Sequence, residues 1–307
     1  MNLRRTLNST LRKTTGLELR QALAQPESPA SKKPPEKKAE APSRPKPVAF
    51  RPPTDPEVDR LLKQPVFIMS PVRSGSTLLR VLLNGHSQLH SPHELHIRRL
   101  TVGHSTQLAK RSMEELDLDS ADLEHLLWDR VMHREVVKSG KEFIVEKTPS
   151  NAFAWKRIAA CWPDARFVFL LRHPVSIARS WYEADTEKRT PESAAEDALR
   201  YMKAVERARK GLSGHTVRYE ELTADPEDSI QQICAFLGVK FEQDMLSYGP
   251  RGDEDLKKGL GDWRDKIRSG SVQPGRELPT AEEIPAVLRE ISESWGYLDE
   301  RADAKSE

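Results

Sequence analysis

Apolar positions along the chain follow two alternating patterns from about residue 64 onward. Continuous apolar runs stand at residues 65–69, 143–145 and 167–171, and residues 217–219 suit a fourth strand. Short runs of this kind are typical of strands that are buried on both faces. Between them apolar residues recur every three or four positions, as they do on helices. Strands that alternate with helices predict an α/β fold in three layers, with a central parallel sheet flanked by helices.

Start and stop signals place three of the helices. A stripe of leucines over residues 78–83 ends at Gly85, and Pro174 begins a helix that runs to about residue 183. Asp225 and the proline after it supply a helix cap and a first-turn residue, and Gly238 closes that helix. Ligands of open parallel sheets bind beyond the carboxyl ends of the strands. The loops after the predicted strands are therefore the places to look for a site.

The first 60 residues differ from the rest in composition. They hold 10 of the 22 prolines, and 13 Lys+Arg against 7 Asp+Glu give them a balance of +6. Residues 25–60 are rich in Pro and Lys and poor in apolar side chains, which predicts a disordered linker. Leucines spaced by four among basic residues predict a basic amphipathic helix within residues 1–24. Such a helix is a candidate for peripheral docking to an anionic membrane surface or to a partner protein.

The net charge of +2 therefore averages two different pieces. Residues 61–307 hold 36 Lys+Arg against 40 Asp+Glu, a balance of −4, which argues against a nucleic-acid partner. No apolar run approaches the roughly 20 residues that a bilayer requires. The chain has only two cysteines, Cys161 and Cys234, far apart in the sequence, and this predicts buried thiols in a reducing cytoplasm.

The loop after the first predicted strand compares with the phosphate-binding pattern GxxxxGK[ST]. Ser70 stands at the first glycine, Gly75 at the second, Ser76 at the lysine, and Thr77 matches. Backbone N–H groups and a helix N-terminus can still converge on an anion there, which makes the predicted fold P-loop-like. The lysine is missing and the next strands do not end in an unambiguous metal-binding aspartate. The loop, with Arg73, therefore fits a phosphate or sulfate better than it fits Mg²⁺-ATP, and we expect no metal.

A second anion site is predicted after the strand at residues 167–171. Arg172 ends that strand, and Ser180 follows two helical turns later. A guanidinium binds phosphate through two hydrogen bonds, and a hydroxyl can add a neutral one. The alternative is an arginine that forms a salt bridge at the sheet edge. Two anion-suited loops on one sheet favour a ligand with phosphate groups at both ends.

Four segments together resemble the sulfotransferases that use 3′-phosphoadenosine 5′-phosphosulfate (PAPS), in that family's order over about residues 64–265. PVFIMSPVRSGSTLLRVLL is similar to the family's 5′-phosphosulfate loop, and RFVFLLRHPVSIARSWY to its 3′-phosphate motif. VRYEELTADPEDSIQQICAFLGV resembles its strand–Tyr-Glu–helix segment. VEKTPSNAFAW resembles the Lys-Thr-Pro segment of the bacterial, Golgi-type and tyrosylprotein branches.

The resemblance implies an activity. Residues 61–307 would form a sulfotransferase domain that moves a sulfuryl group from PAPS to a hydroxyl acceptor. The transfer would be an in-line displacement that uses a general base and no metal, and the product nucleotide would be adenosine 3′,5′-bisphosphate (PAP). The acceptor could be a small molecule, a glycan or a lipid, and the oligomeric state stays open.

The resemblance also implies roles for the matching residues. The residues that would hold the 5′-phosphosulfate are Arg73, Ser74, Gly75, Ser76 and Thr77. Those that would hold the 3′-phosphate or lie near the adenine are Arg172, Ser180 and Tyr219. A later basic segment would close over the 3′-phosphate with Lys257, Lys258 and Gly259.

For catalysis, the resemblance implies Glu94 as the general base, with Arg73 and Lys147 stabilising the departing charge. His93 and His96 are rival bases, because another branch of the family uses histidine. Two other functions stay open: a P-loop-type small-molecule kinase, and a non-catalytic nucleotide-binding adaptor. Dependence on Mg²⁺-ATP would support the kinase.

Overall fold

A computed structural model describes residues 50–53, 55–247 and 270–298. All of them belong to one compact unit, Val48–Glu307. The helix predicted within residues 1–24 lies outside the described residues, as does most of the predicted linker. The division into helix, linker and domain stays a prediction.

Five parallel strands form one sheet with the order β2-β3-β1-β4-β5. The strands are β1 (Val66–Met69), β2 (Leu89–His90), β3 (Phe143–Glu146), β4 (Arg166–Leu171) and β5 (His215–Arg218). All four residues of β1 are buried, as are the last five of β4. Their continuous apolar runs therefore reflect burial on both faces, and the predicted central parallel sheet is confirmed.

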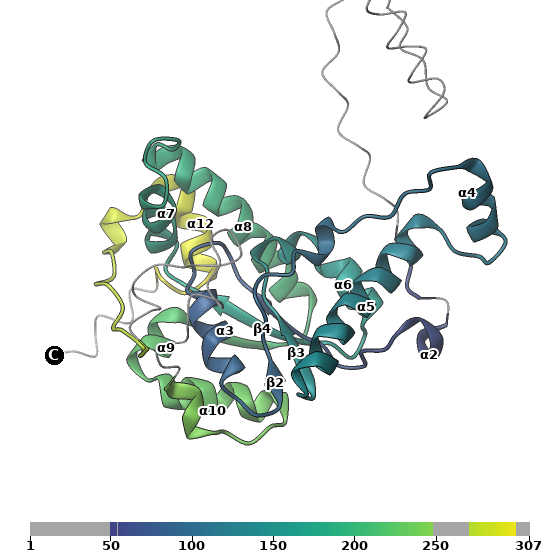
Figure 1. The fold of residues 1–307 in the computed structure, drawn as a ribbon. Helices are drawn as coiled ribbons and strands as arrows, with labels where there is room; N and C mark the ends of the chain where they lie inside the picture. Colours follow the sequence, from purple (N-terminus) through teal and green to yellow (C-terminus); the bar gives the residue numbers. More distant parts are fainter. Residues whose placement is uncertain (1–49, 54, 248–269, 299–307) are drawn as a thin grey trace, which may run out of the picture. The chain divides into compact units, whose positions relative to one another are not determined.

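Helices and short 3₁₀ turns (η) connect the strands. In chain order they are α2 (Pro56–Asp59), α3 (Ser76–Asn84), η1 (Ile97–Arg99), α4 (Gln107–Glu114), α5 (Ser120–Ser139), η2 (Pro149–Ala154), α6 (Trp155–Cys161), α7 (Pro174–Glu183), α8 (Pro191–Gly211), α9 (Tyr219–Ala224), α10 (Pro226–Leu237), η3 (Gln243–Leu246), η4 (Ala281–Glu283) and α12 (Ala286–Ser294). Figure 1 shows them on both sides of the sheet.

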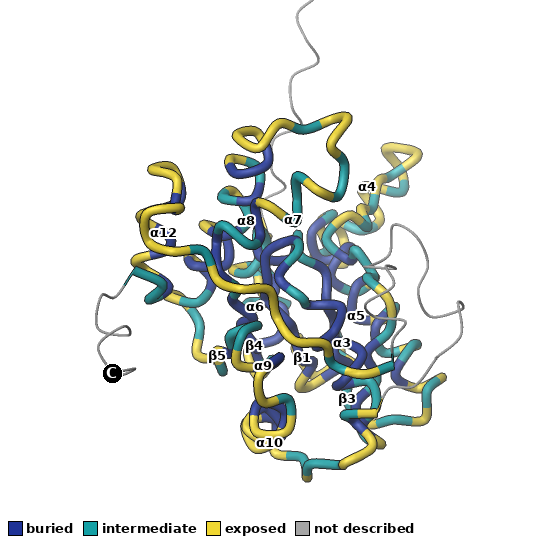
Figure 2. Tube along the Cα trace, turned by 90° about the vertical axis from the view of Figure 1, so that its left-hand side faces the viewer, coloured by how far each residue is buried: buried dark blue, intermediate teal, exposed yellow. Residues whose placement is uncertain are grey.

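The core lies in two layers, one on each face of the sheet. Phe67 and Met69 of β1 pack into a cluster with residues of α5, α6, α7, α8 and α12. Val66 and Ile68, which alternate with them, pack into a second cluster with α3, α9 and α10. In Figure 2 the strands form the buried centre between exposed outer surfaces. This is the three-layer arrangement that the sequence predicts.

Two element boundaries differ from the prediction. The fourth predicted strand ends at Arg218, and Tyr219 begins α9 instead. The change occurs because the Glu221 side chain accepts a hydrogen bond from the Arg218 N–H at 3.2 Å, which caps a helix at this point. The edge strand β2 has only two residues, too few for a periodic pattern to indicate it.

The described part of the predicted linker, together with the first two residues of the predicted domain, packs against α5. Arg51 donates to Asp122 at 2.7 Å, and the N–H groups of Leu61 and Leu62 donate to Asp129 at 2.7 and 3.2 Å. The short helix α2 is capped by Asp55. These contacts fix the chain where it enters the sheet.

Candidate active site

The loop between β1 and α3 has the backbone shape of an anion-binding turn. Arg73 and Gly75 have left-handed φ angles of 59° and 87°, and α3 begins at Ser76. Such turns point N–H groups toward one place, and the helix N-terminus adds positive potential. A Cβ at Gly75 would lie 2.2 Å from Cδ2 of Tyr219. Glycine is therefore favoured by the φ angle and required by the neighbouring ring.

The hydroxyl side chains of this loop are buried. Ser74 is fully buried, and its Oγ donates to the Pro71 carbonyl at 2.9 Å. Ser76 and Thr77 are also buried, and Thr77 Oγ1 lies 3.4 Å from Nζ of Lys147. These side chains stabilise the loop and connect it to the end of β3. The backbone N–H groups are then the loop's candidate anion donors.

Arg172 follows β4 directly and lies against the same loop. Its Nη1 donates to the Arg73 carbonyl at 2.9 Å, and its guanidinium carbon is 4.3 Å from the centre of the Tyr219 ring. Its Nε is buried without a hydrogen-bond partner, and no carboxylate within the described residues pairs with it. Burial lowers the pKa of Arg172. The guanidinium is thus oriented by neutral groups and suited to an anionic ligand.

Ser180 completes the group predicted around Arg172. Its Oγ accepts a hydrogen bond from Nε of Arg73 at 3.1 Å. Arg73, Arg172, Ser180 and Tyr219 therefore lie together at the carboxyl edge of the sheet. The alternative of a salt-bridged arginine is not what the described residues show.

Glu220 fixes the backbone beside Arg172 and was not predicted from the sequence. One carboxylate oxygen accepts from the N–H of His173 at 2.9 Å, and the other accepts from the hydroxyl of Tyr297 at 2.7 Å. The carboxylate thus ties the turn after β4 to the C-terminal part of the chain. Its partners are distant in sequence, so no local pattern indicated this role.

A buried ion pair stands at the end of β3. Lys147 is 1% exposed, and its Nζ donates to Oε1 of Glu94, whose side chain is 12% exposed. Burial lowers the pKa of Lys147, and the Glu94 carboxylate opposes that effect. Because Lys147 also reaches Thr77, it lies between the carboxylate and the loop. The structure therefore brings together the predicted base, the predicted cation and the loop between β1 and α3.

The two rival histidines differ in position. His96 lies with its Nε2 3.4 Å from Oε2 of Glu94, whereas His93 is exposed. His96 has a left-handed φ of 50°, and its N–H donates to Oγ1 of Thr148 at 3.2 Å. His96 is thus placed to contact the Glu94 carboxylate, and Glu94 itself contacts Lys147.

Glu146 is a buried carboxyl group that the sequence analysis did not select. It accepts hydrogen bonds from Thr148 Oγ1 at 2.6 Å, from the Leu95 N–H at 3.3 Å and from Asn151 Nδ2. Burial raises the pKa of Glu146 to about 7. Its oxygens therefore hold the Glu94 loop against the turn after β3. The signal that could have found it is its place next to Lys147 at the end of a buried strand.

Arg276 approaches the Arg172 group from the C-terminal part of the chain. Its Nη1 donates to Glu183 at 2.8 Å, which raises its pKa. Burial has the largest effect on the pKa of Arg172 and lowers it, whereas Tyr219 and Glu220 raise it. The positive charge of Arg276 has a smaller effect and lowers that pKa. Arg276 was not predicted from the sequence. The three predicted residues of the late basic segment, Lys257, Lys258 and Gly259, lie outside the described residues.

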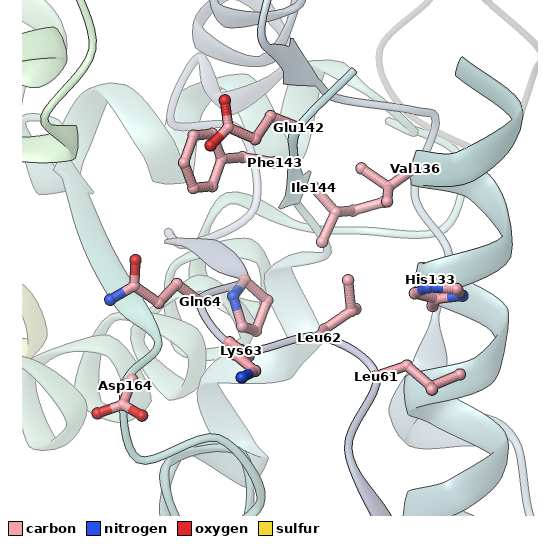
Figure 3. A pocket seen from close by; sticks show the side chains of 11 residues that line it. Leu61, Leu62, Lys63, Gln64, His133, Val136, Glu142, Phe143, Ile144 and Asp164 are labelled. Carbon is pink, nitrogen blue, oxygen red and sulfur yellow. The ribbon is translucent and has the colours of Figure 1, made fainter. Parts of the chain in front are cut away.

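A separate cavity of about 450 Å³ lies at the other edge of the sheet. Residues 61–65 and 142–144 line it, together with His133, Val136 and Asp164 (Figure 3). Because the two lining segments lead into β1 and β3, the cavity is at the amino ends of these strands. It does not include any of the predicted site residues.

Within residues 50–53, 55–247 and 270–298, no group of His, Cys, Asp and Glu side chains is arranged to hold a metal ion. In the same part of the chain, every helix is too short or too polar to cross a bilayer.

Sequence comparison matches the chain to known proteins. The family model described as "Sulfotransferase family" matches residues 65–243. The nodulation protein NoeE of Sinorhizobium fredii is 24% identical over 72% of this chain and 62% of its own length. Protein-tyrosine sulfotransferase 1 of Danio rerio is 23% identical over 63% of this chain and 59% of its own length. The matches thus span about three fifths of these relatives.

Solved structures show the same fold. The sulfotransferase domain of the curacin biosynthetic pathway has a TM-score of 0.58 at 24% identity and covers 76% of this chain and 98% of its own. The sulfotransferase domain of the Synechococcus PCC 7002 olefin synthase has a TM-score of 0.57 at 24% identity and covers 81% and 99%. The family model covers more than half of the chain, including the loop after β1, the ion pair after β3 and Arg172 after β4. The chain belongs to the sulfotransferase family.

Proposed function

We propose that this protein transfers a sulfuryl group from PAPS to the hydroxyl group of an acceptor. The observation that carries the proposal is the environment of Arg172. This guanidinium has a buried, unpartnered Nε and no carboxylate partner within the described residues, and it lies against an anion-binding turn. A nucleotide with a phosphate at each end would supply both missing anions.

The residues divide into two phosphate sites. Arg172 and Ser180 would hold the 3′-phosphate, with Arg276 adding positive charge from the C-terminal part of the chain. The N–H groups of residues 73–77 and the N-terminus of α3 would hold the 5′-phosphosulfate. Tyr219 lies between the two sites, against Gly75 and Arg172, where its ring can contact the nucleotide.

The Glu94–Lys147 pair supplies the catalytic groups. The nucleotide contributes the sulfuryl group, which the acceptor oxygen displaces from the bridging oxygen of the phosphosulfate. Glu94 accepts the proton of the acceptor hydroxyl, and the ion pair with Lys147 holds this carboxylate in place. Lys147 and Arg73 stabilise the negative charge that develops on the bridging oxygen. No step of this proposal uses a metal.

The acceptor is proposed only as a hydroxyl compound: a small molecule, a glycan or a lipid. The name of one relative refers to protein tyrosine, but that chain is 23% identical, and the match leaves two fifths of it uncovered. A cytoplasmic location and a docking role for residues 1–24 stay predictions.

Titration calorimetry with the full-length chain tests the proposal. We expect saturable binding of PAP without added metal, and binding of Mg²⁺-ATP at least about tenfold weaker, since the loop lacks the lysine that contacts the β- and γ-phosphates. Tight binding of Mg²⁺-ATP without binding of PAP would favour the kinase and overturn the proposal. PAP binding with no release of PAP from PAPS in the presence of any acceptor would favour the adaptor.

A further inference from the structure

Arginine side chains and aromatic rings gather next to the candidate base. Arg98 lies four residues after Glu94, and its guanidinium carbon is 5.6 Å from the centre of the Phe153 ring. Arg200 of α8 is 5.9 Å from the same ring and 5.6 Å from the ring of Tyr201. The two rings pack edge to face with their centres 4.9 Å apart. Two guanidinium groups therefore share one aromatic ring.

Backbone contacts hold this arginine–aromatic group (Arg98, Phe153, Arg200 and Tyr201) close to the catalytic pair. The N–H groups of Leu95 and His96, which lie between Glu94 and Arg98, donate to Glu146 and Thr148. Glu146 and Thr148 flank Lys147 in the sequence. The turn η2, which contains Phe153, begins at Pro149, directly after Thr148. The group therefore lies on the Glu94 side of the site. The Arg172 site is built by other elements, namely β4, α7 and α9.

The charges of the group are not balanced. Arg98 is half-buried, and within the described residues no carboxylate forms a hydrogen bond or ion pair with it. Burial lowers the pKa of Arg98, and the neighbouring Arg99 lowers it further. Arg200 pairs with Asp197 at 2.9 Å, but Arg200 is 65% exposed, and Asp197 also accepts from Trp181. Of these three arginines, only Arg200 pairs with a carboxylate within the described residues, and that carboxylate also binds Trp181.

A cation–π contact can orient a guanidinium, but it leaves the N–H donors at the edge of the plane without an acceptor. These donors form strong paired hydrogen bonds with a carboxylate or another oxyacid group. A ligand anion would also offset the repulsion between Arg98 and Arg99.

We propose that Arg98, supported by Phe153 and Arg200, binds an anionic group of the acceptor. The acceptor is then a hydroxyl compound that carries a carboxylate or another oxyacid group near the hydroxyl that is sulfated. This inference rests on the proposed function and names the substrate class of the same site. Arg98 acts in acceptor binding, whereas Glu94 and Lys147 act on the reacting atoms.

The test uses acceptor pairs that differ only in charge. Three carboxylate compounds are compared with their primary amides: 4-hydroxyphenylacetate, glucuronate and 3-hydroxydecanoate. The full-length enzyme is given PAPS, and release of PAP is measured for the wild type, Arg98→Gln, and the control Arg111→Gln. Arg111 is an exposed arginine of α4 with no assigned contact to the site. Binding of the same compounds to the PAP-saturated enzyme is measured by calorimetry.

We expect the wild type to prefer the acid in at least one pair by about tenfold or more in kcat/KM or in affinity, as is typical of a charge-assisted hydrogen bond. Arg98→Gln should reduce that preference to about one to threefold, mainly through KM, while Arg111→Gln keeps it. Arg200→Gln should have a smaller effect, since Arg200 is exposed and paired.

Two results would overturn the inference: equal turnover and binding within every pair, including no response from either member, or an acid preference that survives in Arg98→Gln. Failure of the proposed function has a different signature, because the wild type would then not bind PAP. PAP affinity itself should be equal in Arg98→Gln and the wild type.

Discussion

The ends of β3 and β4 each place a cation at the carboxyl edge of the sheet, but in opposite electrostatic settings. Arg172 after β4 has no carboxylate partner within the described residues and is oriented by a carbonyl and an aromatic ring. Lys147 after β3 is paired with Glu94 and follows a second carboxyl group, Glu146. Within the described residues, Arg172 therefore has no paired carboxylate, whereas Lys147 already has one.

We propose that this difference separates nucleotide binding from the chemical step. A cation with only neutral partners attracts a permanent anion such as a phosphate ester. A cation in a buried ion pair can instead hold a carboxylate in position to accept a proton, and it can stabilise charge that appears during the reaction. We therefore expect changes at the two strand ends to affect different measurements.

Replacing Glu94, the carboxylate that pairs with Lys147, should have the largest effect on turnover. Glu94→Gln would remove the proposed proton acceptor but keep the shape of the side chain, so we expect kcat to fall by about 10²- to 10⁴-fold. PAP affinity, measured by calorimetry, should stay within about threefold of the wild type because Arg172 is untouched.

His96→Gln is the matched control for this change, since His96 Nε2 lies 3.4 Å from the Glu94 carboxylate. It should lower kcat by about tenfold or less, as expected for a group that only contacts the base. Loss of turnover in His96→Gln together with near-normal turnover in Glu94→Gln would transfer the role of base to the histidine.

The second carboxyl group at the end of β3 should make stability depend on pH. Burial raises the pKa of Glu146 from 4.5 to about 7. Between these values the unfolded chain loses the proton while the folded chain keeps it, so the free energy of unfolding falls as pH rises, by about 3 kcal/mol. Glu146→Gln cannot titrate, so its stability relative to the wild type should increase by that amount from pH 4.5 to pH 8.

Chemical denaturation at a series of pH values measures this difference. Glu290→Gln serves as the matched control, because it is the same substitution at a side chain that is 87% exposed. A constant difference between Glu146→Gln and the wild type over the whole range would show that Glu146 is already ionised in the folded protein.

Arg276, which lies near Arg172, should show the smallest effect when it is replaced. It is half-exposed and paired with Glu183, so we expect Arg276→Gln to weaken PAP binding by about three- to tenfold without changing kcat. Arg207→Gln, an exposed arginine of α8, is the control. A fall in kcat at saturating PAPS with unchanged PAP affinity would place Arg276 elsewhere in the mechanism.

Much of the fold could be predicted because its signals are local. The apolar runs of β1, β3 and β4 and the ends of α7 and α10 depend on burial and on capping residues within a few positions. Gly238 illustrates this: its φ of 67° closes α10 in the left-handed conformation that glycine adopts easily. The convergence of Arg73 and Arg172 could also be predicted, since parallel strands bring their carboxyl ends to one edge.

The residues that sequence reasoning missed depend on distant partners. Glu220 pairs with Tyr297, 77 positions away, and Arg276 with Glu183, 93 positions away. Glu146 lies beside a residue that was selected, but the hydrogen bonds that it accepts from Leu95 and Asn151 are set by how two loops pack. No spacing rule in one sequence indicates such contacts. A strand end can be predicted as a site more readily than the groups that hold it in place.

The most direct test of the central claim compares two nucleotides that differ by one phosphate. Calorimetry would measure the affinity of PAP and of adenosine 5′-monophosphate for the wild type and for Arg172→Gln. We predict that the wild type prefers PAP by about ten- to a hundredfold, the usual value of a charge-assisted contact, and that Arg172→Gln binds both nucleotides within about threefold of each other. Equal affinities in the wild type, or a preference for PAP that survives in Arg172→Gln, would contradict the account.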